Sequence, residues 1–193
     1  MSYTNKEHHS SCVTPDEDAI DVLDEQGVKT GEVLSRKKVH QLGKVHRAIR
    51  LYLFEASSKK LLVQKRPSNV AHFPNMFNVS VTGHVDAGEE SIQTVKRELK
   101  EELNMDPNQV KIDFLFSIRC DIILDPNYID RQFNDVYLGW ANFKLEDIQF
   151  DPKEISEVRL IHFSAFEHML LKRKKELSYA YLEECKRILP YIS

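Results

Sequence analysis

Residues 83–103 read GHVDAGEESIQTVKRELKEEL, and this stretch decides the fold because the spacing of its residues changes within it. The segment just before it alternates apolar and polar residues, which is the period of a strand. The stretch itself places apolar residues at helical intervals, at Ile92, Val95, Leu99 and Leu103. The sequence therefore predicts a strand that leads into an amphipathic helix.

Three glutamates, Glu98, Glu101 and Glu102, share one face of this predicted helix. They span about 100° of the helix surface, next to the apolar stripe, so we expect them along the rim of a cleft. Carboxylates at this spacing repel one another by a few tenths of a kcal/mol in water and by more when partly buried. A solvated charged face and a cation site are the two interpretations. A hard ion such as Mg²⁺, which takes oxygen ligands, would relieve the repulsion.

Two further charged residues extend the pattern. Arg97 lies one turn before Glu101 and can hold its carboxylate in place, and Glu89 is placed to reach back to Arg97. The complete spacing is Gly-x5-Glu-x7-Arg-Glu-apolar-x-Glu-Glu, which favours a cation site over a solvated helix face. It is formed by Gly83, Glu89, Arg97, Glu98, Leu99, Glu101 and Glu102.

The composition suits one domain with its own core. The chain has 193 residues with 41% hydrophobic content, and we expect one domain at residues 19–193 after a disordered lead-in at residues 1–18. A net charge of −3 disfavours nucleic acid as a partner. Three separated cysteines predict reduced thiols in a cytoplasmic protein. No apolar run reaches the roughly 20 residues that cross a bilayer, so no membrane association is expected.

The remaining patterns predict several strands around the central helix and a second helix at the C-terminus. The strand at 77–85 precedes the acidic segment, and a long helix is expected from Ser164 onward. Together these elements indicate an α+β sandwich. The other strands are expected near a turn in residues 19–36, in a hairpin at 48–56 and 60–66, and at 110–120, 135–144 and 157–163.

The acidic segment resembles the Nudix box, the signature of hydrolases that cleave diphosphates linked to another group. The strand order fits the Nudix-type α/β/α sandwich with a mixed central sheet over most of the chain. The resemblance implies that Mg²⁺ or Mn²⁺ bridges the diphosphate and activates a water. It makes Glu98 and Glu102 metal ligands, Glu101 a further ligand or the base, and the Gly83 carbonyl a further ligand. Asn104 stands where the family has glycine, and asparagine is the best substitute for a left-handed helix end.

Three flanking stretches resemble a Nudix subgroup related to type I isopentenyl-diphosphate isomerase, which moves a double bond and hydrolyses nothing. That enzyme has a cysteine where this chain has Thr82, and a glutamate pair on a later strand where this chain offers Phe133 and Asp135. A threonine hydroxyl cannot match a thiol as a proton donor, because its pKa is far from neutral. Since the acidic box is also complete, hydrolysis is favoured. The stretches are residues 39–55, 61–85 and 133–144.

Other candidate residues follow from the same resemblance. His40, His46 and His84 correspond to histidines that bind metal in the isomerases, and either a structural or a metal-binding role is open for each. Glu154 lies where several Nudix branches have their general base. Lys65 and Arg66 end a predicted strand and are placed for charge-assisted hydrogen bonds to a diphosphate. Substrate contacts are thus predicted for Lys65, Arg66, His46 and His84.

The sequence as a whole predicts a cytoplasmic, Mg²⁺- or Mn²⁺-dependent Nudix hydrolase that attacks a small-molecule diphosphate with an activated water. The catalytic set is Glu101, Glu154 and Arg97. The substrate is either a nucleoside diphosphate derivative or a small prenyl diphosphate. An isomerase-like enzyme and a non-catalytic nucleotide-binding module are the alternatives. The sequence leaves open whether the chain forms a homodimer.

Overall fold

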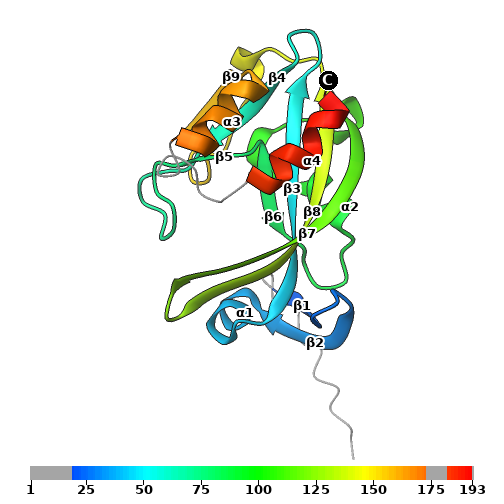
Figure 1. Ribbon diagram of the computed structural model, residues 1–193, viewed down its shortest axis with the longest axis vertical. Helices are drawn as coiled ribbons and strands as arrows, with labels where there is room; N and C mark the ends of the chain where they lie inside the picture. The colour runs from blue at the N-terminus through cyan, green and yellow to red at the C-terminus, as the bar shows by residue number, and fades with distance from the viewer. Residues whose placement is uncertain (1–18, 173–181, 193) are drawn as a thin grey trace, which may run out of the picture.

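A computed structural model describes residues 19–172 and 182–192, so the disorder predicted for residues 1–18 lies outside the described residues. The strands and helices form a mixed nine-stranded sheet and two helical layers (Figure 1). In chain order they are β1 (Ala19–Leu23), β2 (Lys29–Ser35), α1 (Arg36–Leu42), β3 (Val45–Glu55), β4 (Lys60–Lys65), β5 (Phe77–Asn78), β6 (Val81–His84), α2 (Ser91–Leu103), β7 (Lys111–Asp125), β8 (Tyr128–Ala141), β9 (Glu157–Ile161), α3 (Phe163–Lys172) and α4 (Leu182–Ile192).

Strand β3 is the centre of the sheet. It pairs in parallel with β8 along its whole length, from the Val45–Arg131 pair to the Glu55–Ala141 pair. Along its other edge it pairs antiparallel with β6 and, only at its last two residues, with β4. All but one of its residues are buried, which explains why its sequence from Ala48 to Phe54 is apolar except at Arg50.

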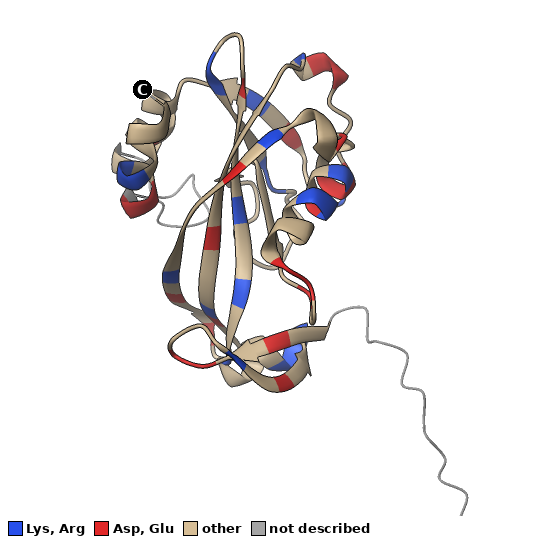
Figure 2. Cartoon of the chain, turned by 90° about the vertical axis from the view of Figure 1, so that its right-hand side faces the viewer, with Lys and Arg blue, Asp and Glu red and all other residues tan. Residues whose placement is uncertain are grey.

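Side chains of β3 alternate between two cores on opposite faces of the sheet. Leu51 and Leu53 pack into a cluster with Leu99 of α2, whereas Tyr52 and Phe54 pack into a cluster formed with α3 and α4. Figure 2 shows the C-terminal helix on one side of the sheet and the charged helix α2 on the other. This layering confirms the predicted α+β fold, the Nudix-type α/β/α sandwich with a mixed sheet.

The strand predicted over residues 77–85 is broken into β5 and β6. The break lies at Ser80, whose hydroxyl accepts a hydrogen bond from the Leu53 amide at 2.8 Å and donates to the Leu62 carbonyl at 2.6 Å. These two backbone groups belong to β3 and β4, which separate at this point. Ser80 therefore bridges the gap, and the chain changes its pairing partner from β4 to β3 as it passes.

Other expected elements differ in extent. The hairpin of β3 and β4 is confirmed, but β7 and β8 form a much longer hairpin than predicted, with Pro126 and Asn127 in its turn. Helix α1 was not predicted, and it ends at Gly43 in the left-handed conformation. Of the long C-terminal helix expected from Ser164 onward, the structure describes α3 and α4, which pack on one core (Figure 1), while residues 173–181 lie outside the described residues.

The described residues include two free cysteines, Cys120 and Cys185. Within residues 19–172 and 182–192, no helix has the length and apolarity needed to span a membrane.

Helix α2 has a side-chain cap at its start and a left-handed residue at its end. The Glu90 and Gln93 side chains form a capping box, and the Glu90 amide donates to the Gln93 side chain at 2.8 Å. At its end, Asn104 has φ 50° and ψ 33°, the left-handed conformation expected of a residue in place of glycine. The Asn104 amide group also donates to Gln149 at 3.2 Å on the surface.

The backbone conformation at Asn104 predicts a specific order of stability. Asn104→Ala should lower the free energy of unfolding by about 1 kcal/mol, because an alanine Cβ is strained in this conformation. Asn104→Gly should leave it unchanged or slightly higher, since glycine adopts it freely. Urea denaturation of both variants measures the difference. An equal loss in the two variants would mean that the side-chain contact with Gln149, and not the backbone, is what matters.

Candidate active site

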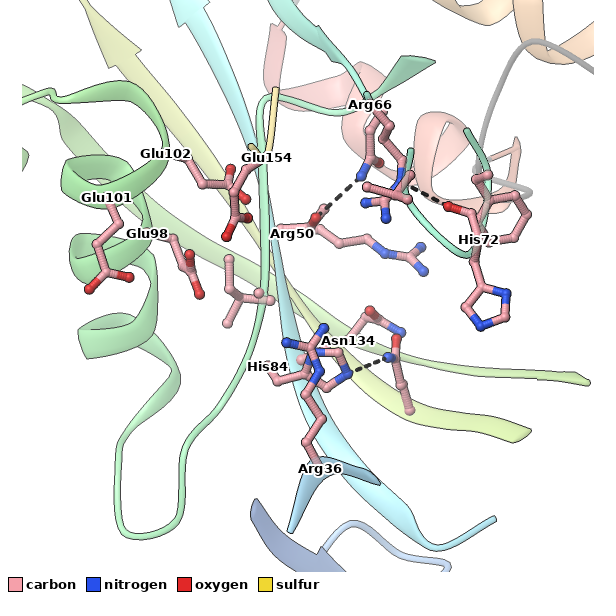
Figure 3. Close-up of a pocket in the computed structure, with 18 of the residues that line it drawn as sticks. Arg36, Arg50, Arg66, His72, His84, Glu98, Glu101, Glu102, Asn134 and Glu154 are labelled. Atoms are coloured by element: carbon pink, nitrogen blue, oxygen red, sulfur yellow. Dashed lines mark hydrogen bonds between the residues drawn. The ribbon is translucent and has the colours of Figure 1, made fainter. Parts of the chain in front are cut away.

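A cavity of about 440 Å³ opens beside α2, where β3 and β4 separate. Its wall contains residues from β3, β6, α2, β8 and the loop before β9. Figure 3 shows four glutamates on one side of this cavity and Arg50, Arg66 and His72 on the other. The four glutamates, Glu98, Glu101, Glu102 and Glu154, are all residues that the sequence predicted for the site.

Burial distinguishes Glu98 and Glu102 from an ordinary charged helix face. Only 13% of the Glu98 side chain and 5% of Glu102 are exposed. Burial, with added repulsion from Glu101 and Glu154, raises the pKa of Glu98 to about 7 against the opposing charge of Arg97. Burial also raises the pKa of Glu102 well above its ordinary value, with added repulsion from Glu98 and Glu154. The solvated-face interpretation is therefore wrong for these two residues.

The Glu102 and Glu154 carboxyl groups are brought together by contacts that connect three elements. Gln64 of β4 donates to the Glu102 carboxylate at 3.0 Å. The loop with Glu154 is anchored at both ends, because the Asp151 amide donates to the Glu102 carbonyl at 3.3 Å and the Ser156 amide donates to the Lys65 carbonyl at 2.8 Å. The loop is thus fixed over α2, which places Glu154 close to Glu102 (Figure 3).

Arg97 lines the cavity and orients the carboxylates around it. Its guanidinium bonds to Glu98 at 2.9 Å and Glu101 at 3.2 Å, which confirms the predicted contact with Glu101. It also bonds to Glu89 at 3.1 Å, the predicted orienting partner, and to the His84 carbonyl at 3.3 Å. Since these contacts use its donors, we assign Arg97 a positioning role in place of the catalytic role that the sequence suggested.

Gly83 allows the close approach of Glu98. A Cβ atom at position 83 would lie 2.7 Å from both Cγ and Cδ of Glu98, so the Glu98 side chain would have to move away. The Gly83 backbone lines the same cavity as the glutamates, as the predicted ligand role of its carbonyl requires. The first residue of the motif therefore makes room for the Glu98 side chain.

Two of the four predicted substrate-binding residues line the cavity. Arg66 and His84 do, and the Arg66 Nε donates to the His72 carbonyl at 3.2 Å, which fixes its guanidinium. Lys65 does not, because its ammonium lies over the Phe77 ring at 5.9 Å. His46 has no exposed surface and lies behind the wall. Lys65 alternates to the other face of β4, which the sequence pattern alone does not reveal.

The three histidines gather with Asp130 into one buried group. The ligand atoms of His40, His46, His84 and Asp130 all lie within 4.8 Å of one another. His40 and His46 each contact the Asp130 carboxylate, at 3.5 Å and 3.6 Å. Burial lowers the pKa of His46 to about 4 and that of His84 well below its ordinary value. Neutral imidazoles beside a carboxylate could hold a divalent cation, so the metal-binding interpretation keeps its place beside the structural one.

The direction of alternate side chains along β8 corrects the comparison of Phe133 and Asp135 with the glutamate pair of the isomerases. Asp135 bonds to Arg47 at 2.7 Å outside the cavity, and Phe133 packs near Gly27. Besides Tyr128 at its first position, the cavity-facing residues of β8 are Gln132 and Asn134. Because neither amide can act as a catalytic acid, this wall lacks a carboxylate even with the parity corrected.

Several cavity residues were missed by the sequence patterns. Arg50 lies in the apolar run of β3, and this isolated charge in a buried strand was an available signal. Gln64, Gln132 and Asn134 gave no comparable signal, since isolated amides occur in many strands. Arg36 belongs to the unpredicted helix α1. All except Gln64 line the cavity itself.

An α/β/α sandwich with clustered glutamates on the helix beside its cavity defines a protein of the Nudix fold. A family model of the NUDIX domain matches residues 44–184, and the chain belongs to the Nudix family. Nudix hydrolase 3 of Arabidopsis thaliana is 32% identical over 160 residues, 81% of this chain and 21% of that protein. This chain thus spans about a fifth of that relative's length.

Two other similar proteins extend the comparison. An isopentenyl-diphosphate Delta-isomerase of Pectobacterium atrosepticum is 29% identical over 136 residues, 70% of this chain and 71% of that protein. A crystal structure of a protein from Deinococcus radiodurans has a TM-score of 0.70 at 22% identity, covering 88% of this chain and 98% of the other. The structural similarity supports the fold, while the sequence relatives include both hydrolases and isomerases.

The raised pKa of Glu98 predicts how cation binding depends on pH. A proton competes with the cation below a pH of about 7, because the empty site favours the neutral acid. The affinity for Mn²⁺ should therefore increase about tenfold between about pH 6 and about pH 8. Electron paramagnetic resonance of free Mn²⁺ measures this affinity. A pH-independent affinity would show that Glu98 does not bind the cation.

Proposed function

We propose that the protein is a Mg²⁺- or Mn²⁺-dependent hydrolase that splits a small-molecule diphosphate. The observation that carries this proposal is the wall of carboxylates formed by the little-exposed Glu98 and Glu102 and by the exposed Glu154, which faces arginines across one cavity. Negative oxygen ligands on one side and guanidinium groups on the other suit an anion bound together with hard cations. We also keep the proposal of a cytoplasmic location, which rests on the predicted reduced thiols.

The ligand chemistry fits the cation that the family uses. Glu98 and Glu102 would hold it, with Glu101 and the Gly83 carbonyl as further ligands, all of them oxygen donors. A bound divalent cation would neutralise the repulsion that raises the pKa of Glu98 and Glu102. When present, the cation supplies Lewis-acid stabilisation of the phosphoryl oxygens and a more acidic water.

Three residues of this chain would supply proton transfer, diphosphate binding and positioning of the acids. Glu154 lies on a loop above the α2 acids, where its carboxylate can accept a proton from an attacking water. Arg66 is placed to stabilise the negative charge of the diphosphate by charge-assisted hydrogen bonds. Arg97 keeps Glu98 and Glu101 in a fixed orientation, so that no reorganisation is needed as charge develops.

The isomerase alternative is disfavoured by the proton-transfer groups in the cavity. Thr82 occupies the position of the isomerase cysteine, and its hydroxyl accepts a hydrogen bond from Asn78 at 3.2 Å. On the strand opposite, Gln132 and Asn134 cannot exchange protons near neutral pH. An isomerase needs an acid and a base on the two sides of a double bond, and these positions offer neither.

Hydrolysis depends on Glu102 and Glu154 if the proposal is right. Glu102→Gln should abolish measurable turnover, because it removes a cation ligand at constant size. Glu154→Gln should reduce kcat at least about 10²-fold, the typical loss for an acid–base group. Glu157→Gln is the matched control, since Glu157 is paired with Arg159 and does not line the cavity. Phosphate release from a panel of diphosphates with Mg²⁺ provides the measurement. Wild-type rates in the Glu102 variant would refute the cation assignment.

Thr82 separates hydrolysis from isomerisation. In a hydrolase, Thr82→Val removes only one hydroxyl from the wall and should reduce turnover less than about tenfold, or about 1.4 kcal/mol. In an isomerase, the same change should cost at least about 10²-fold. Deuterium uptake from D₂O into isopentenyl diphosphate, measured beside phosphate release, distinguishes the two. Uptake by the wild type that is lost in Thr82→Val would establish the isomerase alternative. Binding of diphosphates with neither reaction would establish the non-catalytic module.

A further inference from the structure

The side of the cavity opposite the glutamates is polar and positively charged. Arg50 and Arg66 extend into it from β3 and from the end of β4, and Figure 3 shows the Arg50 guanidinium on the far side of the cavity from Glu98 and Glu101. Gln132 and Asn134 of β8 complete this wall. Such a surface suits oxygen acceptors and anionic groups, whereas a hydrocarbon chain would desolvate these polar groups without replacing their hydrogen bonds.

Arg50 is held in place from behind by the C-terminal helix. Its Nη1 bonds to the carboxylate of Glu184 on α4, and the Tyr52 hydroxyl donates to the other Glu184 oxygen at 2.8 Å. Arg50 and Glu184 are each only 2% exposed. A buried ion pair of this kind is costly to form unless its geometry is fixed, and the hydrogen bond from Tyr52 fixes it. The arrangement points one fixed guanidinium at the cavity.

Asn134 supplies a second, independent observation. Its side chain is 1% exposed and lines the cavity, and its Nδ2 group has no hydrogen-bond partner within residues 19–172 and 182–192. A buried amide donor without a partner costs about 1–3 kcal/mol, so a cavity-facing one indicates a ligand that accepts its hydrogen bond. An alkyl group could not do so, but a phosphate or carboxylate oxygen could.

We propose that the part of the substrate beyond its diphosphate is polar and carries a further anionic group, which Arg50 and Asn134 bind. The substrate class is a diphosphate joined to a phosphorylated sugar or similar polyol, and small prenyl diphosphates are excluded. Arg50 is the specificity-determining residue, and Glu184 positions it. This inference deepens the proposed function and rests on it for the location of the diphosphate beside the glutamates.

Binding measurements test the inference separately from catalysis. Calorimetry with Ca²⁺ in place of Mg²⁺, to slow turnover, should compare three diphosphates with the full-length protein. Isopentenyl diphosphate has an apolar second half, ADP-ribose a polar one, and 5-phosphoribosyl 1-diphosphate a polar one with an added phosphate. We expect the phosphorylated compound to bind at least tenfold more tightly than isopentenyl diphosphate. Equal or tighter binding of isopentenyl diphosphate would overturn the inference.

A double variant identifies Arg50 as the cause of the preference. Arg50→Gln with Glu184→Gln removes both charges of the buried pair, so that no unpaired charge remains inside. The preference for the added phosphate should fall to less than threefold. Arg47→Gln with Asp135→Asn is the matched control. Arg47 is also a β3 arginine paired with a carboxylate, but neither Arg47 nor Asp135 lines the cavity. Melting temperatures of both variants establish that they are folded.

The remaining outcomes separate the two proposals. An equal loss of affinity for all three compounds in the Arg50 variant would show that Arg50 binds the diphosphate itself, which overturns the inference. A retained preference in that variant would overturn it as well. If the preference is present and depends on Arg50 but none of the compounds is hydrolysed with Mg²⁺, the inference stands and the proposed hydrolase function fails.

Discussion

The repulsion among carboxylates along one wall of the cavity is the constraint on which the rest of the site depends. Glu98 and Glu102 lie one turn apart on α2 with little exposed surface, and Glu154 faces them from a separate loop. Removing a carboxylate from water costs several kcal/mol unless it is compensated. Arg97 bonds directly to Glu98, whereas the hydrogen bond to Glu102 comes from the neutral Gln64 and the charge of Arg66 acts on it without a direct bond. A divalent cation would relieve the repulsion that is left.

The cavity itself exists because β3 and β4 pair at only two positions before they separate. Two strands that part would leave unsatisfied amides and carbonyls, which proteins avoid. Ser80 satisfies one group on each strand, and the chain then continues as β6 along β3. This change of partner carries Gly83 under α2, where the absence of a side chain admits Glu98. The position of Glu98 beside the cavity thus follows from a break in a strand.

Local patterns predicted the parts of the site whose geometry is local. The helical spacing of Glu98, Glu101 and Glu102 and the contact from Arg97 follow from one helix, and both were predicted correctly. Glu154 was found only through the family resemblance. Its position near Glu102 depends on backbone hydrogen bonds that attach its loop to the end of α2 and to the end of β4. The β8 residues that line the cavity were assigned wrongly, because a shift of one residue exchanges the two faces of a strand.

The partner of Arg50 shows the limit of sequence patterns most clearly. Arg50 and Glu184 are separated by 134 residues, and nothing in either segment predicts that they meet. In the proposed function, the acidic segment holds the diphosphate and its cation, and the chain has relatives among both hydrolases and isomerases. A difference in substrate would then come from the opposite wall, where the buried Arg50 guanidinium and the Asn134 amide suit polar groups better than an alkyl chain.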